Sequence, residues 1–597
     1  MTVKEIMFET LGFDGEFIIE SEYYDGLKYE YKDRVLEVGC ADKAGLCRAI
    51  TKTVQAIREG KTEFSGEEKL YFKKCGPMLD MSRNGVMKPG QVKQYLNYMA
   101  SMGLNMLMLY TEDTYELKDY PYFGYMRGRY TQEELKDIDD YADMLGIELI
   151  PCIQVLGHLG NYLKWPEANA VRDTPTVLKV DGDKTYELIE TMIQATRNTF
   201  RSDKIHIGMD ETHDVGLGRY LKENGFTDQY TLYNRHLKRV CEICKKHGYE
   251  NPMVWGDMYL RLGSKSGLYY DESCVIPQEA IDAVPKQVDI VYWDYYHNSQ
   301  ECFNTFIQRH HALTGKVSFA GAVWTWDGFT VDNKLTYETM IPALSSCIDN
   351  GVETVLATMW GNSGCETDYF LGFGGLALFA EYLYKGKEAS RESAAELCKI
   401  CTGLDMDVLD TMSDFHKMPK CYFPFQKLDG FGKRYIWCDL LINAWGIGSD
   451  EDYKILKEAG DAIPEITGKW ADRYALIKTV FAAAAEKCKM LMELRPKYLA
   501  GDKAYLQELA ENRIPALIQS YRNLIQMHQH LWEEVNKPYG WEVLCARYGG
   551  VIARLEYACD VIGRYVAGEL EAIGELLEEP IPESYLGAGR QISVMAD

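Results

Sequence analysis

The sequence lacks the long apolar runs, dense cysteines and basic character that would assign it to a specialised class. No stretch approaches the ~18 consecutive apolar residues of a membrane-spanning helix, so we expect no association with a membrane. Residues 1–17 contain no apolar segment of the kind found in signal peptides. The 17 cysteines are odd in number and far below the density of a disulfide scaffold. We therefore expect reduced thiols in a cytoplasmic protein.

Positive charge is also scarce. The chain has 65 Lys and Arg against 90 Asp and Glu, which gives a net charge of −25. Because such a surface repels a phosphate backbone, we expect no nucleic-acid partner. Neither a glycine-rich phosphate-binding fingerprint nor a G-x-S-x-G nucleophile motif occurs. Tyrosine, by contrast, is frequent at 42 residues, which suits a surface that binds polar rings and equally suits a packed core.

Eight short apolar runs alternate with segments of helical period. Near-continuous apolar runs are typical of parallel strands that are buried on both faces. Eight such units predict a (β/α)8 barrel within residues 71–390. The main alternative, an open doubly wound sheet, usually carries the glycine fingerprint that is missing here. The runs are Pro77–Met81, Leu104–Tyr110, Ile147–Val155, Lys204–Met209, Pro252–Gly256, Val288–Asp294, Lys316–Val323 and Val352–Met359.

Two further regions flank the predicted barrel. Residues 1–70 combine a short apolar strand with a helix, which predicts a small α+β domain. Residues 391–597 keep a helical period and lose the strand pattern, which predicts a helical C-terminal region. The clearest helix of the barrel is 131–145, where Thr131 and Glu134 form a capping box.

Carboxylates and tryptophans gather at the predicted strand ends, where barrel enzymes place their catalytic groups. Five of the 11 tryptophans fall at the ends of four consecutive strands. Such aromatic walls suit a pyranose, whose C–H faces stack on rings while its hydroxyls bond to carboxylates. The group therefore predicts a sugar site, although single tryptophans equally suit the barrel core. The strand-end residues predicted to bind substrate are Trp255, Trp293, Tyr295, Tyr296, Trp326, Asp327, Trp360 and Glu366.

Asp210 and Glu211 are adjacent carboxylates at the end of the fourth predicted strand. Two such groups repel each other, and a dry pocket raises the pKa of one of them. A carboxyl group with a raised pKa can protonate a leaving group near neutral pH. A solvated acidic loop is the alternative in so acidic a chain, but a strand end is buried more often than a loop.

Metal binding is a second interpretation of these residues. His206, Asp210 and His213 share one strand end, and a Cys-x2-Cys pair at 241–244 lies in a helical pattern. Zinc modules usually place two such pairs ~15–20 residues apart. The second pair, 398–401, begins 154 positions after residue 244 (398 − 244). We therefore predict neither a metal nor another cofactor.

The segment His206-Ile207-Gly208-Met209-Asp210-Glu211 resembles the H-x-G-x-D-E signature of glycoside hydrolase family 20, the β-N-acetylhexosaminidases. The resemblance extends over residues 70–385, and the small N-terminal domain is similar to the one these enzymes carry. Segments that resemble the family's first three strand motifs are Gly76–Arg83, Asn105–Asp113 and Ile150–His158.

The resemblance implies an exo-acting, retaining enzyme without a metal, which acts on an oligosaccharide or glycoconjugate with a terminal β-linked GlcNAc or GalNAc. In this family the 2-acetamido oxygen of the substrate attacks the anomeric carbon. Glu211 would be the general acid and then the base, while Asp210 would hold the acetamido N–H and stabilise the oxazolinium intermediate. Asp113 and His158 match the pair that supports the acid.

The same resemblance implies a tyrosine that bonds to the acetamido oxygen, for which Tyr295 and Tyr296 are both candidates. Tryptophans would enclose the acetamido group and the sugar ring. These are Trp293, Trp326 and Trp360.

Three positions depart from the family pattern. Cys75 stands where an Arg usually precedes the first glycine, Tyr110 replaces a His, and Leu156 replaces a Pro. Because the missing Arg would bind sugar hydroxyls, we expect Glu366 and Asp327 to hold them instead. Carboxylates adapt to either O4 epimer, so both β-GlcNAc and β-GalNAc should be accepted.

Two other functions stay open on the residues alone. A conventional retaining glycosidase would pair Glu211 with Asp257 or Asp327 and cleave sugars without an N-acetyl group. The second alternative is a protein that binds sugar in the barrel without catalysing a reaction. The region 391–597 would form either a homodimer interface or a wall of the active site.

Overall fold

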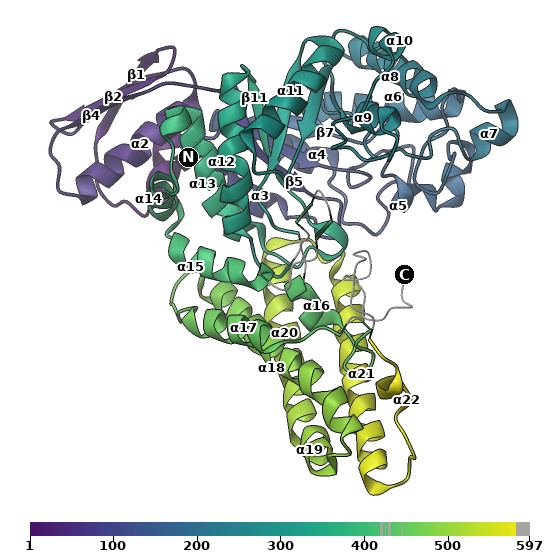
Figure 1. Ribbon diagram of the computed structural model, residues 1–597. Coiled ribbons are helices and arrows are strands. Elements are labelled where there is room, and N and C mark those ends of the chain that lie inside the picture. The colour runs from purple at the N-terminus through teal and green to yellow at the C-terminus, as the bar shows by residue number, and fades with distance from the viewer. Residues whose placement is uncertain (327, 418–421, 424–425, 428–430, 445, 581–597) are drawn as a thin grey trace.

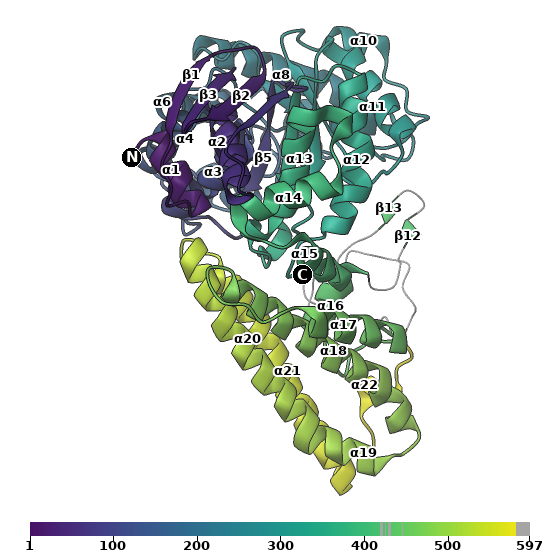
Figure 2. The same ribbon diagram turned by 90° about the vertical axis from the view of Figure 1, so that its left-hand side faces the viewer.

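The computed structural model describes residues 1–580 apart from 327, 418–421, 424–425, 428–430 and 445 (Figure 1). A small sheet with helices is followed by a barrel of parallel strands and then by a helical region that projects from the barrel (Figures 1 and 2). Within these residues no helix is both long enough and apolar enough to cross a membrane.

The N-terminal part is a four-stranded sheet in the order β1-β3-β2-β4, and its predicted α+β character is confirmed. Alternate residues of β2 are buried, as expected for a sheet with one covered face. Arg48 is fully buried and pairs with Glu68 at 2.6 Å and with Glu381 of the barrel at 2.7 Å, which fixes the sheet to the barrel. The elements are α1 (Val3–Leu11), β1 (Ile18–Tyr23), β2 (Leu27–Lys32), β3 (Val35–Cys40), α2 (Lys43–Arg58) and β4 (Phe64–Glu68).

The barrel contains seven parallel strands in the order β7-β6-β5-β11-β10-β9-β8. Each lies within one of the predicted apolar runs, β5 beginning slightly earlier, so the predicted parallel sheet is confirmed. Their inward side chains form a closed apolar cluster that includes Met78, Met108 and Leu356. The strands are β5 (Lys74–Asp80), β6 (Met106–Tyr110), β7 (Glu148–Cys152), β8 (Met253–Trp255), β9 (Asp289–Trp293), β10 (Val317–Ala322) and β11 (Thr354–Met359).

The fourth predicted strand is only a short segment, residues 205–208, which lies between the two edge strands. His206 forms parallel bridges to Cys152 of β7 and to Met253 of β8. The N–H of Ile153 donates to the carbonyl of His206 at 2.9 Å, and the N–H of Ile207 donates to that of Met253 at 2.9 Å. The segment therefore closes the barrel. It stops being extended at Gly208, where φ becomes +70°.

Helices cover the outside of the strands (Figure 1). The capping box of Thr131 and Glu134 is present at the start of α4, as predicted. The helices of the barrel are α3 (Pro89–Met102), α4 (Gln132–Met144), α5 (Gly160–Leu163), α6 (Asp183–Thr199), α7 (Arg219–Asn224), α8 (Gln229–Lys246), α9 (Asp257–Gly263), α10 (Gln278–Asp282), α11 (Gln300–Thr314), α12 (Asn333–Asp349) and α13 (Phe373–Lys385).

The C-terminal region is helical, as predicted, apart from one two-stranded ladder, β12 with β13. The connection between its long helices α20 and α21 lies on the loop that follows β5 and on the start of α4. Asn536 bridges Met87, and Lys537 pairs with Glu134 at 2.7 Å. The region thus contacts the barrel at the end where its strands have their carboxyl ends. Its elements are α14 (Arg391–Thr402), α15 (Met406–Met412), β12 (Tyr422–Phe423), β13 (Gln426–Lys427), α16 (Phe431–Trp437), α17 (Asp450–Ala462), α18 (Ala471–Leu499), α19 (Lys503–Glu508), α20 (Ile514–Val535), α21 (Trp541–Ala567) and α22 (Gly574–Leu577).

Candidate active site

Asp210 and Glu211 follow the segment that closes the barrel, in a turn of unusual backbone conformation. Met209 has φ of +75° and Glu211 has φ of +48°, a region that residues other than glycine rarely adopt. Such conformations persist only where the surroundings enforce them, and they gather at functional sites. The two side chains differ in exposure to solvent: 13% of the Asp210 side chain is exposed, compared with 43% of the Glu211 side chain.

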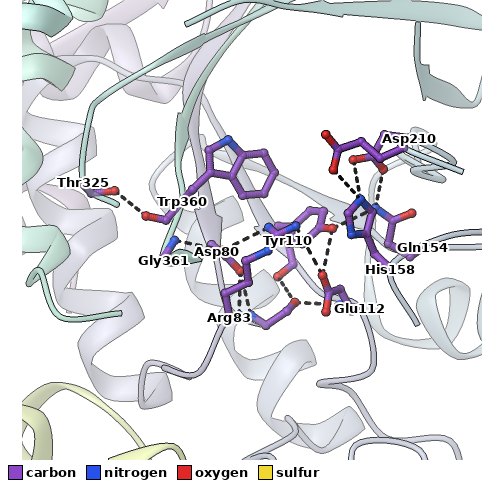
Figure 3. A network of polar contacts seen from close by, with 12 residues as sticks. Asp80, Arg83, Tyr110, Glu112, Gln154, His158, Asp210, Thr325, Trp360 and Gly361 are labelled. Carbon is purple, nitrogen blue, oxygen red and sulfur yellow. Dashed lines mark hydrogen bonds and ion pairs between the residues drawn. The ribbon is translucent and has the colours of Figure 1, made fainter. Parts of the chain in front are cut away.

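Asp210 is held as an anion by two partners (Figure 3). Nε2 of Gln154 donates to its Oδ1 at 2.7 Å, and Nε2 of His158 lies 3.1 Å from its Oδ2. Burial opposes the charge, but His158 and Gln154 outweigh burial and lower the pKa of Asp210 well below its usual range. Although burial lowers the pKa of His158, Asp210 raises it to about 9. At neutral pH the two groups therefore form an ion pair.

Glu211 has different neighbours. Nε2 of His158 lies 3.6 Å from its Oε2, and Nη2 of Arg261 lies 3.5 Å from its Oε1. Its backbone N–H donates to Oδ2 of Asp257 at 3.1 Å. The raised pKa predicted for one member of the adjacent pair is not found at Asp210. Next to the pair, the buried carboxyl of Asp257 has a raised pKa, because burial raises it to about 7.

Arg83, which sequence reasoning missed, reaches the site from the loop after β5 (Figure 3). Its guanidinium lies 5.1 Å from the ring centre of Tyr110 and 4.9 Å from that of Trp360. It pairs with Asp80 at 3.3 Å and with Glu112 at 3.6 Å. With 23% of its side chain exposed, Arg83 can still meet a ligand.

Arg83 reaches this side of the site although Cys75 stands at the position where the resemblance places an arginine. Cys75 lies near the start of β5, whereas Asp210 and Glu211 lie at the carboxyl ends of the strands. Its buried thiol donates to the carbonyl of Phe379 on α13 at 3.7 Å, so it points toward the outer helices. The residue type at position 75 does not decide whether a guanidinium faces the ligand.

Aromatic rings line the ends of strands β9, β10 and β11. Trp293 stacks on Tyr295 with 5.4 Å between ring centres, and Tyr295 meets Trp326 edge-on at 5.5 Å. Burial raises the pKa of the Tyr295 hydroxyl, and Asp210 and Glu211 add to the rise, so this hydroxyl lies within electrostatic reach of both carboxylates. Tyr296 instead packs on Trp324 at 5.6 Å.

Other predicted site residues lie away from these aromatic rings or have partners other than those predicted. Trp255 is 1% exposed and belongs to the apolar interior of the barrel. Oδ1 of Asp113 accepts from Nε of Arg127 at 3.2 Å, so the described partner of Asp113 is an arginine rather than His158. Glu366 is buried between Lys433 at 2.8 Å and Arg547 at 3.0 Å, both from the C-terminal region. Asp327 lies outside the described residues.

Among the residues that the structure describes, two groups of side chains are close enough to share a metal ion. One is His158, Asp210 and Glu211, and the other is Asp294, His297 and Cys302. His206 belongs to neither group, and burial lowers its pKa to about 3. The Cys-x2-Cys pair at 241–244 is buried on one face of α8, as the non-metal interpretation predicts.

Two family models match the chain and define it as a glycoside hydrolase barrel with an appended domain. The catalytic domain of glycosyl hydrolase family 20 matches residues 72–314, and the Glycoside Hydrolase 20C C-terminal domain matches residues 433–594. The chain therefore belongs to glycoside hydrolase family 20.

Curated relatives and solved structures resemble parts of the chain. Beta-hexosaminidase 3 of Arabidopsis thaliana is 27% identical over 213 residues, which cover 32% of this chain and 38% of that protein. Hexosaminidase D of Homo sapiens is 28% identical over 210 residues, which cover 33% of this chain and 39% of that protein. A β-N-acetylhexosaminidase structure from Streptomyces coelicolor A3(2) has a TM-score of 0.47 at 18% identity, covering 68% of this chain and 90% of that one. The chain thus spans about two fifths of the two curated relatives it matches.

Proposed function

We propose that this chain is an exo-acting, retaining β-N-acetylhexosaminidase that removes terminal β-linked GlcNAc or GalNAc by substrate-assisted catalysis. The observation that carries the proposal is the unequal pair, an anionic Asp210 fixed by Gln154 and His158 beside a half-exposed Glu211. A fixed anion stabilises developing positive charge, and an accessible carboxyl group exchanges protons with a leaving group.

In the proposed reaction the acetamido oxygen of the substrate attacks the anomeric carbon while Glu211 protonates the departing oxygen. The glycosidic bond breaks and an oxazolinium ion forms, whose positive charge Asp210 stabilises. Glu211 then takes a proton from the water that opens this ion, so the anomeric configuration is retained. The Tyr295 hydroxyl, which lies within electrostatic reach of the two carboxylates, would donate to the acetamido oxygen and hold it for attack.

The conventional mechanism needs a second carboxylate that can attack the sugar. Asp257 is poorly suited to this role, because it is fully buried and its Oδ2 already accepts from the Glu211 N–H and from Arg261. Its position supports the substrate-assisted alternative.

We propose that hydroxyl recognition rests on Arg83 and Glu112. Arg83 offers donors, and Glu112, which is 6% exposed, offers an acceptor on the same side of Trp360. Trp293, Trp326 and Trp360 would enclose the sugar and its acetamido group.

A cytoplasmic location fits the described cysteines, which are all free thiols. We also propose that the three domains are residues 1–70, 71–390 and 391–597. A homodimer formed through the last of these remains a prediction.

Release of nitrophenol from 4-nitrophenyl N-acetyl-β-glucosaminide, compared with the plain β-glucoside, tests the proposed function. We expect hydrolysis of the first glycoside only, since the second lacks the attacking acetamido group. Comparable kcat/KM on both would support the two-carboxylate mechanism, and no hydrolysis of either would support a barrel that only binds sugar.

A further inference from the structure

Asp257 and Arg261 form a buried pair behind the proposed acid. They are the first and fifth residues of α9, a spacing that places both side chains on one face of the helix. Asp257 is fully buried, and 16% of the Arg261 side chain is exposed. Nε of Arg261 donates to Oδ2 of Asp257 at 3.0 Å.

This pair contacts Glu211 at two points. Oδ2 of Asp257 also accepts from the backbone N–H of Glu211 at 3.1 Å, and Nη2 of Arg261 lies 3.5 Å from the carboxylate of Glu211. Asp257 therefore contacts the backbone of Glu211, Arg261 contacts its side chain, and the two partners also contact each other. These contacts matter because Glu211 has φ of +48°, a backbone conformation that residues other than glycine rarely keep unless their surroundings enforce it.

The two partners act on Glu211 with opposite charge. Glu211 also lies near His158 from the loop after β7, His213 from its own turn and Tyr295 from the loop after β9. Asp257 is faced by Arg261 from the same helix and by Asp210 from the turn after residue 208. Tyr233 of α8 and Tyr269 of the loop after α9 also face Asp257. Burial raises the pKa of Asp257 to about 7, and Arg261 opposes the rise. A carboxylate near Glu211 favours its protonated form, whereas a guanidinium favours its ionised form.

We propose that Asp257 and Arg261 are positioning residues that hold Glu211 in its reactive conformation and set the pH range over which it carries its proton. They act through Glu211 and not on the sugar. The proposal rests on the proposed function, since it concerns the group that serves there as acid and base.

The test compares pH profiles of kcat/KM on 4-nitrophenyl N-acetyl-β-glucosaminide for the full chain and two variants. Asp257→Asn keeps the shape but removes a negative charge, so the basic limb should move to lower pH. Arg261→Gln removes a positive charge, so the same limb should move to higher pH. Each shift should be on the order of 1 pH unit, the lower end of the effect that one nearby charge has on the pKa of a carboxyl group.

Two further variants separate charge from folding. Arg261→Lys keeps the positive charge and loses the planar fork, so kcat should fall while the limb stays in place. Glu279→Gln makes the same carboxylate-to-amide change on exposed α10 and should leave the profile unchanged.

If the basic limb shifts to lower pH in Asp257→Asn and to higher pH in Arg261→Gln, the assignment is supported even if kcat falls in both variants. Reduced activity with unmoved limbs, or shifts in the same direction, would show that the pair is only structural. If Asp257→Asn fails to fold, an unmoved limb in Arg261→Gln alone overturns the assignment. A folded wild type without activity would overturn the proposed function first, and this assignment with it.

Discussion

Replacing Glu366 with Gln should destabilise the contact between the barrel and the C-terminal region. The Glu366 side chain is 1% exposed and pairs with Lys433 of α16, 3% exposed, and with Arg547 of α21. Gln keeps the shape and can still accept the hydrogen bond that Nε1 of Trp437 donates at 3.2 Å. Because Gln carries no charge, Lys433 and Arg547 would lose the buried carboxylate with which both of them pair.

The size of the effect follows from burial. Removing one partner of a buried ion pair costs ~3–5 kcal/mol, because the other charge stays buried without compensation. Lys433 keeps a second acceptor, the carbonyl of Trp326 at 3.3 Å, so the lower end of that range, ~3 kcal/mol in the free energy of unfolding, is expected here. The pair of Lys28 with Glu22, whose side chains are 45% and 70% exposed, provides the matched control.

Urea unfolding followed by tryptophan fluorescence measures the difference. Glu366→Gln should lower the unfolding midpoint clearly, whereas Glu22→Gln should leave it unchanged. The KM values for β-GlcNAc and β-GalNAc glycosides should rise together, because the loop that carries Glu366 follows Trp360. A midpoint equal to that of the control would refute the view that this carboxylate joins the two regions.

Three further outcomes are expected. Glu211→Gln should cost ~10²-fold or more in kcat on substrates with poor leaving groups, and less on a dinitrophenyl glycoside that needs little protonation; equal losses would argue against the acid role. Arg83→Lys should raise KM for both epimers about tenfold, since Lys cannot reproduce a planar fork; unchanged nitrophenyl glycoside kinetics would place hydroxyl recognition elsewhere. The pKa of His158 is raised from 6.5 to about 9, so the stability from its pair with Asp210 should be full below pH 6.5 and lost as pH rises through about 9. Urea midpoints between pH 6 and 10 should therefore fall more in the wild type than in His158→Gln, and parallel curves would contradict the ion pair.

Much of the barrel was predictable because buried parallel strands leave an apolar signal in the sequence. The same signal over-extended the fourth strand, since Gly208 and Met209 turn to positive φ while Ile205 and Ile207 remain apolar and buried. The adjacent carboxylates could be predicted as site residues because they follow a predicted strand. The position of a residue along a strand fixes the end of the barrel at which it lies.

Side-chain direction was harder to predict. Cys75 and Arg83 flank the same strand motif, and only the structure shows that Cys75 faces α13 while Arg83 faces Trp360. Likewise Tyr295 and Tyr296 are neighbours in sequence, and only the structure shows that Tyr295 stacks on Trp293 while Tyr296 packs on Trp324.

Contacts between distant segments gave no local signal. Glu366 meets Arg547, a separation of 181 residues, so its neighbours could not be read from the strand end to which it belongs. Asp257 had a local signal, because Arg261 follows it by one helical turn, but its bond to the Glu211 N–H spans 46 residues.

Binding of a thiazoline analogue of the oxazolinium ion tests substrate-assisted catalysis most directly. Calorimetry should give a Kd for the GlcNAc-derived thiazoline at least ~10²-fold below that for GlcNAc itself, because an enzyme binds the reaction's high-energy species more tightly than its product. Asp210→Asn should lose most of this preference while keeping its affinity for GlcNAc. Equal affinity of the wild type for analogue and product would contradict the account.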